Sequence, residues 1–307
     1  MPSLPPPVAA AYLAPEGLVA PVVDALGGAV QEVRGRLVLA NEPRDEAAWW
    51  AANTWLEPQW RRIASIGDGA RWLRSMQRNW AFVGDEFHRR ATLLVEKLPP
   101  LRPRPRPFPF EVPPSPMGGW TLWEHDLMLA SARCSSPFAN GELEFVEHKV
   151  GPPSRAYRKV WEALAVLGRH PQPGERCVDL GAAPGGWTWA LARLGADVVA
   201  VDKAEMEPAI AALDNVTVRT ESAFGLAPED VGPVDWLFSD VICYPKRLLD
   251  LVERWRAAGM ARRFVCTIKF QGEGEHEAAR GFAAIEGARV LHLHHNKHEL
   301  TFLLDAD

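Results

Sequence analysis

The sequence has little cysteine and no long hydrophobic run. Its four cysteines lie far apart in a chain of 307 residues, so neither a disulfide framework nor a C-x-x-C metal motif is present. No apolar run approaches the ~20 residues of a membrane-spanning helix. The N-terminus has neither the basic region nor the apolar core of a secretion signal. We therefore expect a cytoplasmic protein with reduced cysteines, no metal and no membrane contact.

The chain also lacks net positive charge, since its formal net charge is −5. This value argues against a general nucleic-acid binder. One segment differs: residues 61–106 hold eleven basic and four acidic side chains, with Trp60, Trp72 and Trp80 close to them. Basic and aromatic side chains together favour contact with RNA phosphates and exposed bases. The alternative, which the sequence leaves open, is a solvated helix face over core tryptophans.

A dinucleotide-binding motif is absent, although residues 177–202 follow the order of a nucleotide-binding domain. A short apolar strand, a glycine-rich turn, a helix and a second apolar strand succeed one another, and the second strand ends at Asp202. Gly181 and Gly185 are four apart with Pro184 between them, so no G-x-G-x-x-G is present to hold a pyrophosphate. A ligand with ribose and adenine but no pyrophosphate, such as S-adenosylmethionine, fits better. The alternative is an ordinary strand-to-helix turn.

The rest of the C-terminal half continues to alternate between strands and helices. We expect strands over 216–219, 235–239 and 264–268, followed by a closing antiparallel pair over 289–294 and 299–304. Such alternation is typical of a mainly parallel sheet with helices on both faces. The predicted fold class is therefore α/β, Rossmann-like, with antiparallel C-terminal strands and a smaller α+β domain in front of it.

The proline pattern predicts the domain boundaries. Residues 98–119 are rich in proline and arginine, which indicates an extended linker or arm, more a spacer than an RNA contact. This segment separates an α+β domain over 1–97, expected to engage RNA, from the α/β domain over 120–307. In the first domain we expect, among other elements, a helix over 47–56 and a strand over 92–95.

Four ionisable residues are expected at one edge of the sheet. Asp240 and Lys269 each directly follow a predicted strand, Glu299 opens the last strand, and Lys159 lies on the helix before the first strand. Ligands of such sheets bind beyond the carboxyl ends of the strands, next to the glycine turn. The alternative for each residue is an ordinary surface ion pair. Four histidines between 292 and 298 could suggest a metal, but no cysteine or carboxylate completes a site, so a surface or RNA-facing cluster is favoured.

Several motifs together resemble the FtsJ-like family of Rossmann-fold RNA 2'-O-ribose methyltransferases. They are Ser154-Arg-Ala-Tyr-Arg-Lys159, Gly181-Ala-Ala-Pro-Gly-Gly-Trp187, Asp240 and Lys269-Phe-Gln-Gly272. The resemblance implies a class I methyltransferase fold, S-adenosylmethionine as cofactor and a catalytic Lys-Asp-Lys-Glu tetrad. The matching tetrad positions are Lys159, Asp240, Lys269 and Glu299.

Three further motifs resemble the members of this family that methylate a cytidine ribose in large-subunit (23S) ribosomal RNA. They are Ser135–Phe138, Ser239–Pro245 and Asn296–Thr301, and the likeness covers roughly residues 127–305. Those members carry a THUMP-containing N-terminal region. Because the N-terminal part of this chain is shorter, we expect at most a reduced THUMP-like domain.

The resemblance also implies a set of cofactor-binding residues. Ser222 stands where the family has an acid beside the adenine, and Glu221 precedes it. Asp202 is expected to hold the cofactor ribose, and Trp187 to pack beside the turn. The full set is Asp179, Gly181, Ala182, Ala183, Pro184, Gly185, Gly186, Trp187, Asp202, Glu221, Ser222 and Asp240.

The tetrad suits methyl transfer to a ribose hydroxyl, which must lose its proton as the methyl group moves. We expect Lys269 to be the base or to orient the hydroxyl, with Asp240 positioning it and Glu299 holding Lys159. Two alternatives remain: a methyltransferase with a non-RNA substrate, and a non-catalytic RNA-binding or ribosome-assembly factor that retains the fold. The sequence leaves the choice between monomer and homodimer open.

Overall fold

Two structural units divide the chain. The computed structural model describes residues 3–271 and 276–306. One unit comprises residues 1–105 and 112–144, and the other comprises residues 106–111 and 145–307. The boundary expected at residue 120 is therefore wrong. The chain returns to the N-terminal sheets after the proline-rich segment, whereas the end of that segment belongs to the C-terminal unit.

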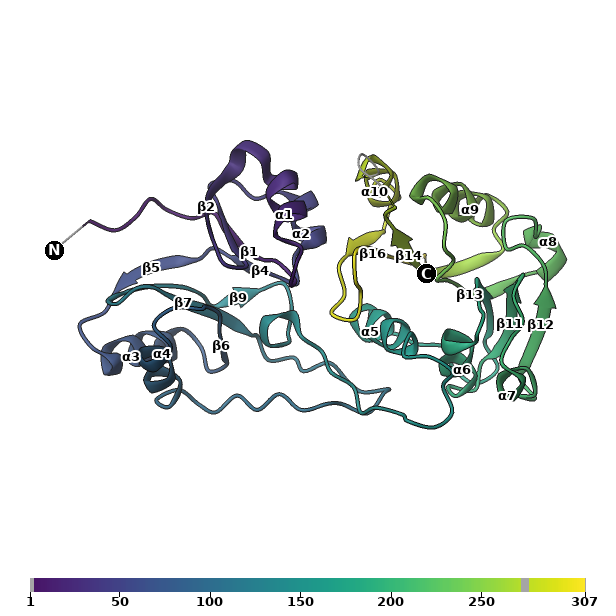
Figure 1. Cartoon of the computed structure of the whole chain (residues 1–307), viewed down its shortest axis with the longest axis horizontal. Coiled ribbons are helices and arrows are strands. Elements are labelled where there is room, and N and C mark those ends of the chain that lie inside the picture. Colours follow the sequence, from purple (N-terminus) through teal and green to yellow (C-terminus); the bar gives the residue numbers. More distant parts are fainter. Residues whose placement is uncertain (1–2, 272–275, 307) are drawn as a thin grey trace. The chain divides into compact units, whose positions relative to one another are not determined.

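The N-terminal unit contains two sheets (Figure 1). One has the strand order β2-β3-β1-β4-β9 and the other β5-β8-β7-β6. Its elements are β1 (Ala10–Leu13), α1 (Val19–Leu26), β2 (Val30–Arg34), β3 (Leu37–Ala40), α2 (Asp45–Trp50), β4 (Asn53–Leu56), β5 (Gln59–Arg62), α3 (Ile66–Met76), β6 (Trp80–Phe82), α4 (His88–Val95), β7 (Gly118–Glu124), β8 (Leu127–Ser131) and β9 (Arg133–Cys134), with short 3₁₀ turns at Gly27–Ala29 and Ala139–Gly141.

Two sequence-based expectations in this unit are wrong. The strand expected over 92–95 is the last turn of α4, because Ala91 and Leu94 are buried three positions apart while Leu93 and Val95 are exposed. The helix expected over 47–56 ends at Trp50, and strand β4 follows within three residues. A short apolar run fits either element when only the local pattern is considered.

The tryptophans of the basic segment belong largely to the core. Trp72 and Trp80 are 9% and 5% exposed and pack in one hydrophobic cluster with Trp120. The partly buried Trp60 donates its indole N–H to the Pro6 carbonyl. Stacking of RNA bases on Trp72 and Trp80 is therefore excluded, which corrects that part of the expected RNA surface.

The C-terminal unit is built on one seven-stranded sheet with the order β12-β11-β10-β13-β14-β16-β15. In chain order this is 3-2-1-4-5-7-6, with β16 antiparallel to both of its neighbours. The fold is thus the Rossmann-like methyltransferase type that the sequence predicts. Helices α9 and α10 lie on one side of the sheet, and α5 and α6 on the other (Figure 1).

The elements of this unit follow the predicted alternation, but the strand predicted over 289–294 is wrong in its second half, because it ends at Leu291. They are α5 (Tyr157–Leu167), β10 (Arg176–Leu180), α6 (Gly186–Ala192), β11 (Asp197–Asp202), α7 (Pro208–Ala211), β12 (Val216–Thr220), α8 (Pro228–Val231), β13 (Val234–Ser239), α9 (Pro245–Ala257), β14 (Ala261–Lys269), α10 (His276–Ala283), β15 (Arg289–Leu291) and β16 (Glu299–Asp305).

The end of the proline-rich segment packs against the C-terminal unit instead of acting as a plain spacer. Phe108 stacks on Trp161 of α5, with ring centroids 5.3 Å apart and planes 18° apart. Phe108 and Phe110 also contact the ring of Phe145. Arg106 forms a parallel β-bridge with Phe145. Aromatic contacts therefore fix residues 106–111 on the helix that carries Lys159.

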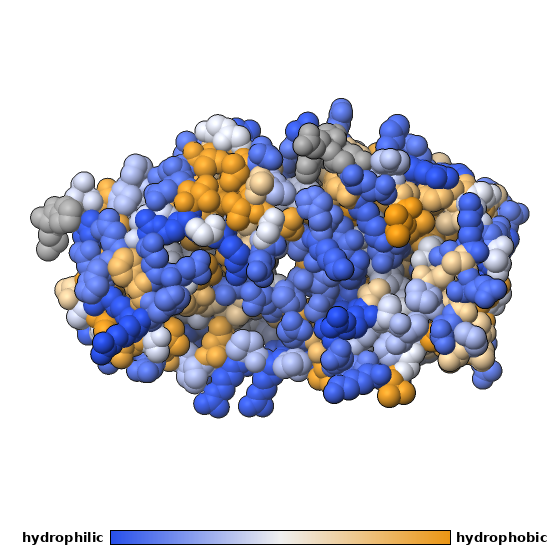
Figure 2. Space-filling model, in the orientation of Figure 1, coloured by the Kyte–Doolittle hydropathy of each residue, from blue (hydrophilic) through white to orange (hydrophobic). Residues whose placement is uncertain are grey.

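Hydrophilic residues cover much of the visible face of each unit, and hydrophobic residues reach the surface in separate patches (Figure 2). Among the residues that the structure describes, none of the helices has both the length and the apolar character needed to span a membrane.

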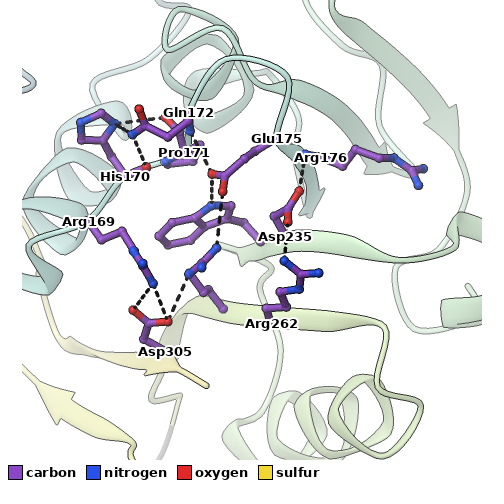
Figure 3. A network of polar contacts seen from close by, with 11 residues as sticks. Arg169, His170, Pro171, Gln172, Glu175, Arg176, Asp235, Arg262 and Asp305 are labelled. Carbon is purple, nitrogen blue, oxygen red and sulfur yellow. Dashed lines mark hydrogen bonds and ion pairs between the residues drawn. The ribbon is translucent and has the colours of Figure 1, made fainter. Parts of the chain in front are cut away.

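An ion-pair network ties the sheet together at the amino ends of its parallel strands (Figure 3). Arg263 of β14 is 5% exposed and pairs with Asp305 at 3.1 Å and with Glu175 at 3.6 Å. Glu175 also accepts the indole N–H of Trp236 at 2.8 Å, and Asp305 accepts a hydrogen bond from Arg169 at 3.1 Å. Strands β13, β14 and β16 and the residue before β10 thereby share one cluster of charges around the buried Arg263.

We predict that Arg263→Met destabilises the C-terminal unit by about 3 kcal/mol, because Glu175 loses the buried guanidinium and Asp305 is left with the half-exposed Arg169. Arg262→Met is the matched control. Its side chain is 67% exposed and pairs with Asp235 at 3.4 Å, so the expected loss is below about 1 kcal/mol. Urea denaturation followed by tryptophan fluorescence measures both changes. Equal shifts of the midpoint for the two variants would contradict the prediction.

Candidate active site

The glycine turn lies at the carboxyl end of β10, where the sheet reverses its strand order between β11 and β13. Gly181 has φ 82°, and a Cβ there would lie 2.7 Å from the Val241 Cα. Gly185 has φ 113°, and a Cβ there would lie 2.7 Å from the Met206 Sδ. Both positions therefore require glycine, for its conformation and for the close approach of neighbouring atoms. Ligands bind at this switch point in open α/β sheets.

Asp202 ends β11 beside this turn. Its carboxylate accepts the backbone N–H of Ala183 at 3.0 Å and that of Ala204 at 2.9 Å. The N–H of Glu221, which follows β12, bonds to the Asp202 carbonyl at 3.0 Å. The acid is thus held against the Gly181–Gly185 turn.

Asp179 lies under the turn and is 1% exposed. Thr188 of α6 donates its hydroxyl to Asp179 Oδ2 at 2.7 Å, whereas Oδ1 is buried without a hydrogen-bond partner. Burial raises the pKa of Asp179 to about 7, and the nearby carboxylates of Asp240 and Asp202 act in the same direction. A buried acceptor without a donor, next to a cradle of glycines, suits a cationic ligand group.

The four ionisable residues meet at the same edge of the sheet. Asp240 Oδ1 lies 3.0 Å from the Lys269 Nζ and 3.6 Å from the Lys159 Nζ, and Lys159 also pairs with Glu299. The Lys269 amine also donates a hydrogen bond to the main-chain oxygen of Asp240. All four side chains are between 9% and 19% exposed. They form one chain of alternating charge: Glu299, Lys159, Asp240, Lys269.

The FtsJ-like methyltransferase family model matches residues 152–267, a range that includes Lys159 and Asp240. Residues 152–267 form an FtsJ-like methyltransferase domain. The match confirms the resemblance noted from the motifs and the interpretation of this domain as that of an S-adenosylmethionine-dependent methyltransferase. Gly272, the last residue of one of those motifs, lies outside the described residues.

Curated relatives are similar to the same part of the chain. Ribosomal RNA large subunit methyltransferase M from Halorhodospira halophila is 37% identical over 157 residues, which cover 48% of this chain and 46% of that protein. The protein of the same name from Methylococcus capsulatus is 36% identical over 168 residues, which cover 50% and 47%. The chain spans about half the length of the curated relatives it matches.

The solved structures that are similar to part of this chain include a putative hemolysin from Streptococcus thermophilus. It is 21% identical, has a TM-score of 0.42, and the likeness covers 55% of this chain and 73% of that one.

Three other predicted cofactor residues of the FtsJ-like domain form hydrogen bonds within the protein. Trp187 is 3% exposed, and its indole donates to the Ala156 carbonyl at 3.0 Å, so the ring is engaged inside the protein. The Glu221 carboxylate accepts from Arg219 Nε at 2.6 Å. Ser222 lies in the turn after β12, and its carbonyl accepts the N–H groups of Gly225 and Leu226.

Glu162 and Thr188 are two supporting residues that the sequence did not reveal. Glu162 of α5 is 3% exposed and accepts the backbone N–H groups of His294 and His295 at 2.7 and 2.9 Å. It thereby fixes the turn that precedes Glu299. The partners of Glu162 lie 132 and 133 positions later, and Thr188 reaches back nine residues across the glycine turn to Asp179, so only the fold identifies these contacts.

The histidine cluster is only partly the surface group that we expected: His298 is exposed and His294 and His295 are half-buried, but His292 is buried. His292 is 7% exposed, its Nε2 lies 2.9 Å from the Lys297 carbonyl, and burial lowers its pKa to about 4. The N–H groups of His294 and His295 serve the Glu162 contact. Among the described residues, no group of three or more potential ligands is arranged to hold a metal ion.

We predict that Asp179→Asn stabilises the protein by up to about 4 kcal/mol at pH 8, since one pKa unit corresponds to about 1.4 kcal/mol. The folded state binds the Asp179 proton more tightly than the unfolded chain does. The free energy of unfolding of the wild type therefore falls between about pH 4 and pH 7 and is level above that range. Asparagine keeps an acceptor for Thr188 and removes this dependence.

Denaturation at pH 5 and pH 8 tests this prediction, with a smaller gain expected at pH 5. Asp197→Asn, an exposed carboxylate at the start of β11, is the control, and we expect little change from it at either pH. An Asp179→Asn protein less stable than the wild type at pH 8 would be inconsistent with the proposed cost of burying this charge.

Proposed function

We propose that this protein transfers the methyl group of S-adenosylmethionine to the 2'-oxygen of an RNA ribose, and that its substrate is a cytidine in large-subunit (23S) ribosomal RNA. The observation that carries the proposal is the chain of charges formed by Glu299, Lys159, Asp240 and Lys269 next to the Gly181–Gly185 turn. Two lysines so placed suit a hydroxyl nucleophile, which must be oriented and must lose a proton.

The residues around the turn fit this cofactor. A backbone without side chains at Gly181 and Gly185 admits close contact, and Asp202 is placed to accept the hydroxyl groups of a ribose. The buried Oδ1 of Asp179 can accept a hydrogen bond from the ammonium group of the methionine part. When bound, S-adenosylmethionine supplies a methyl group on a sulfonium, which is a good leaving group.

Lys269 would act at the 2'-oxygen. Its amine pairs with the Asp240 carboxylate at 3.0 Å and donates a hydrogen bond to the Asp240 main-chain oxygen, which holds the nitrogen at the edge of the sheet where the substrate hydroxyl would lie. Lys269 would orient the hydroxyl there, or accept its proton as the oxygen–carbon bond forms. Lys159, held by Glu299, adds a second positive charge near the oxygen as negative charge develops on it.

Two observations support ribosomal RNA as the substrate. The relatives that match this domain are named ribosomal RNA large subunit methyltransferase M. Exposed arginines of the N-terminal unit, such as Arg71, whose side chain is 68% exposed, can contact RNA phosphates although the nearby Trp72 is buried.

We predict that Lys269→Met lowers the rate of methyl transfer about 10²- to 10⁴-fold, the range for loss of a general acid or base. Affinity for S-adenosylmethionine, measured by calorimetry, should stay within about threefold of the wild type because the turn is intact. Lys246→Met removes an 81% exposed lysine of α9 and should leave both quantities unchanged. A Lys269→Met enzyme as active as the wild type would show that Lys269 has no role in methyl transfer.

Mapping of 2'-O-methyl groups in 23S ribosomal RNA from a strain without the gene tests the substrate directly. We expect one cytidine to lose its mark and to regain it when the wild-type gene, but not the Lys269→Met gene, is restored. An unchanged methylation pattern would overturn the proposed substrate. If purified protein also fails to bind S-adenosylmethionine, the non-catalytic assembly factor becomes the better explanation.

A further inference from the structure

Two large apolar side chains stand exposed in the loop between β13 and α9. Ile242 is 79% exposed and Tyr244 is 63% exposed, whereas Cys243 between them is 7% exposed. The buried thiol anchors the middle of the loop, and its neighbours extend into solvent. Exposing a tyrosine and an isoleucine so close together has no benefit for stability, which favours a role in binding.

This loop is part of the active-site edge. It begins at Asp240, which holds Lys269, and its next residue, Val241, is the one that approaches Gly181 so closely that no Cβ fits there. Ile242 and Tyr244 are thus two and four residues from the carboxylate that joins both lysines. They lie on the short segment between β13 and α9, whose Val241 packs against Gly181 of the cofactor turn.

We propose that Ile242 and Tyr244 form the platform on which the base of the methylated nucleotide rests, with the Tyr244 ring stacked on the base. This inference rests on the proposed function, since the ribose must lie at Lys269 for its base to reach the platform. Proteins that recognise unpaired nucleotides stack their bases on aromatic side chains. The base of a nucleotide lies next to the 2'-oxygen of its own ribose, and the loop that carries Ile242 and Tyr244 begins at Asp240, the residue that holds Lys269.

The size of the platform favours a single base over a second protein. A specific protein interface buries about 800 Å² on each partner, far more than two side chains provide. One nucleobase, by contrast, covers roughly the face of one aromatic ring. Tyr244 directly precedes α9, with Pro245 at the first helical position, which fixes the backbone that carries the ring.

The test compares two forms of an unmodified 23S RNA fragment that contains the mapped cytidine. In one form the target nucleotide is intact, and in the other it keeps its ribose 2'-hydroxyl but lacks the base. Methyl transfer from S-adenosylmethionine by the full chain is measured for the wild type, Tyr244→Ala, Tyr244→Phe and Ile242→Ala. Val218→Ala is the control, because Val218 is also an exposed apolar residue of this unit but lies on edge strand β12.

On intact RNA we expect Tyr244→Ala to lower kcat/KM about five- to 150-fold, as stacking of one base predicts, mainly through a higher KM for RNA. Ile242→Ala should have a smaller effect in the same direction. Tyr244→Phe and Val218→Ala should stay within about twofold of the wild type. On RNA without the base, the wild type and Tyr244→Ala should be equal, because the ring has nothing to stack on. Cofactor affinity should be the same for all variants.

Two results would overturn the platform while leaving the proposed function in place. One is a Tyr244→Ala enzyme as active as the wild type on intact RNA, and the other is an equal loss on both RNAs. If the wild type itself transfers no methyl group to RNA, the proposed function fails, and the platform is rejected together with it. The wild-type measurement therefore separates the two failures.

Discussion

The alternation of charge from Glu299 through Lys159 and Asp240 to Lys269 is the interaction on which the candidate site depends. Each side chain is at most 19% exposed, and an isolated charge in such a position would be costly. Each lysine is compensated by a carboxylate, and Asp240 serves both. The cluster also joins α5, β14, β16 and the end of β13, so the chemistry and the packing of the sheet require the same contacts.

The register between β14 and β16 links this edge of the sheet to the opposite one. Lys269 lies opposite Glu299, and Arg263 lies opposite Asp305. On each strand the two positions are six residues apart. Because six is an even number, their side chains point to the same face of the sheet. A slip by one residue would turn both acids to the other face and break the site and the network in Figure 3 together. One pairing therefore serves function and stability at once.

The sequence predicted the elements that depend on local pattern and chain order. Asp240 and Lys269 each follow a predicted strand, and parallel strands bring their carboxyl ends to one edge of the sheet. The sequence was therefore enough to predict that these two residues lie at the same edge. Long-range partners could not be read this way. Nothing near Glu162 shows that it accepts two N–H groups from residues 132 and 133 positions later. The return of residues 112–144 to the N-terminal sheets was likewise hidden, because the proline-rich segment looked like a boundary.

Helix α5 shows how one element can serve two purposes without conflict. Tyr157 and Trp161 are four residues apart, contact each other and face the aromatic cluster, where Phe108 stacks on Trp161. Lys159 and Glu162 are three residues apart and reach the active-site edge and the turn before Glu299. The helical period separates these pairs onto different faces. Aromatic packing with residues 106–111 therefore sets the position of the helix. That position in turn places Lys159 at the active-site edge and Glu162 at the turn before Glu299.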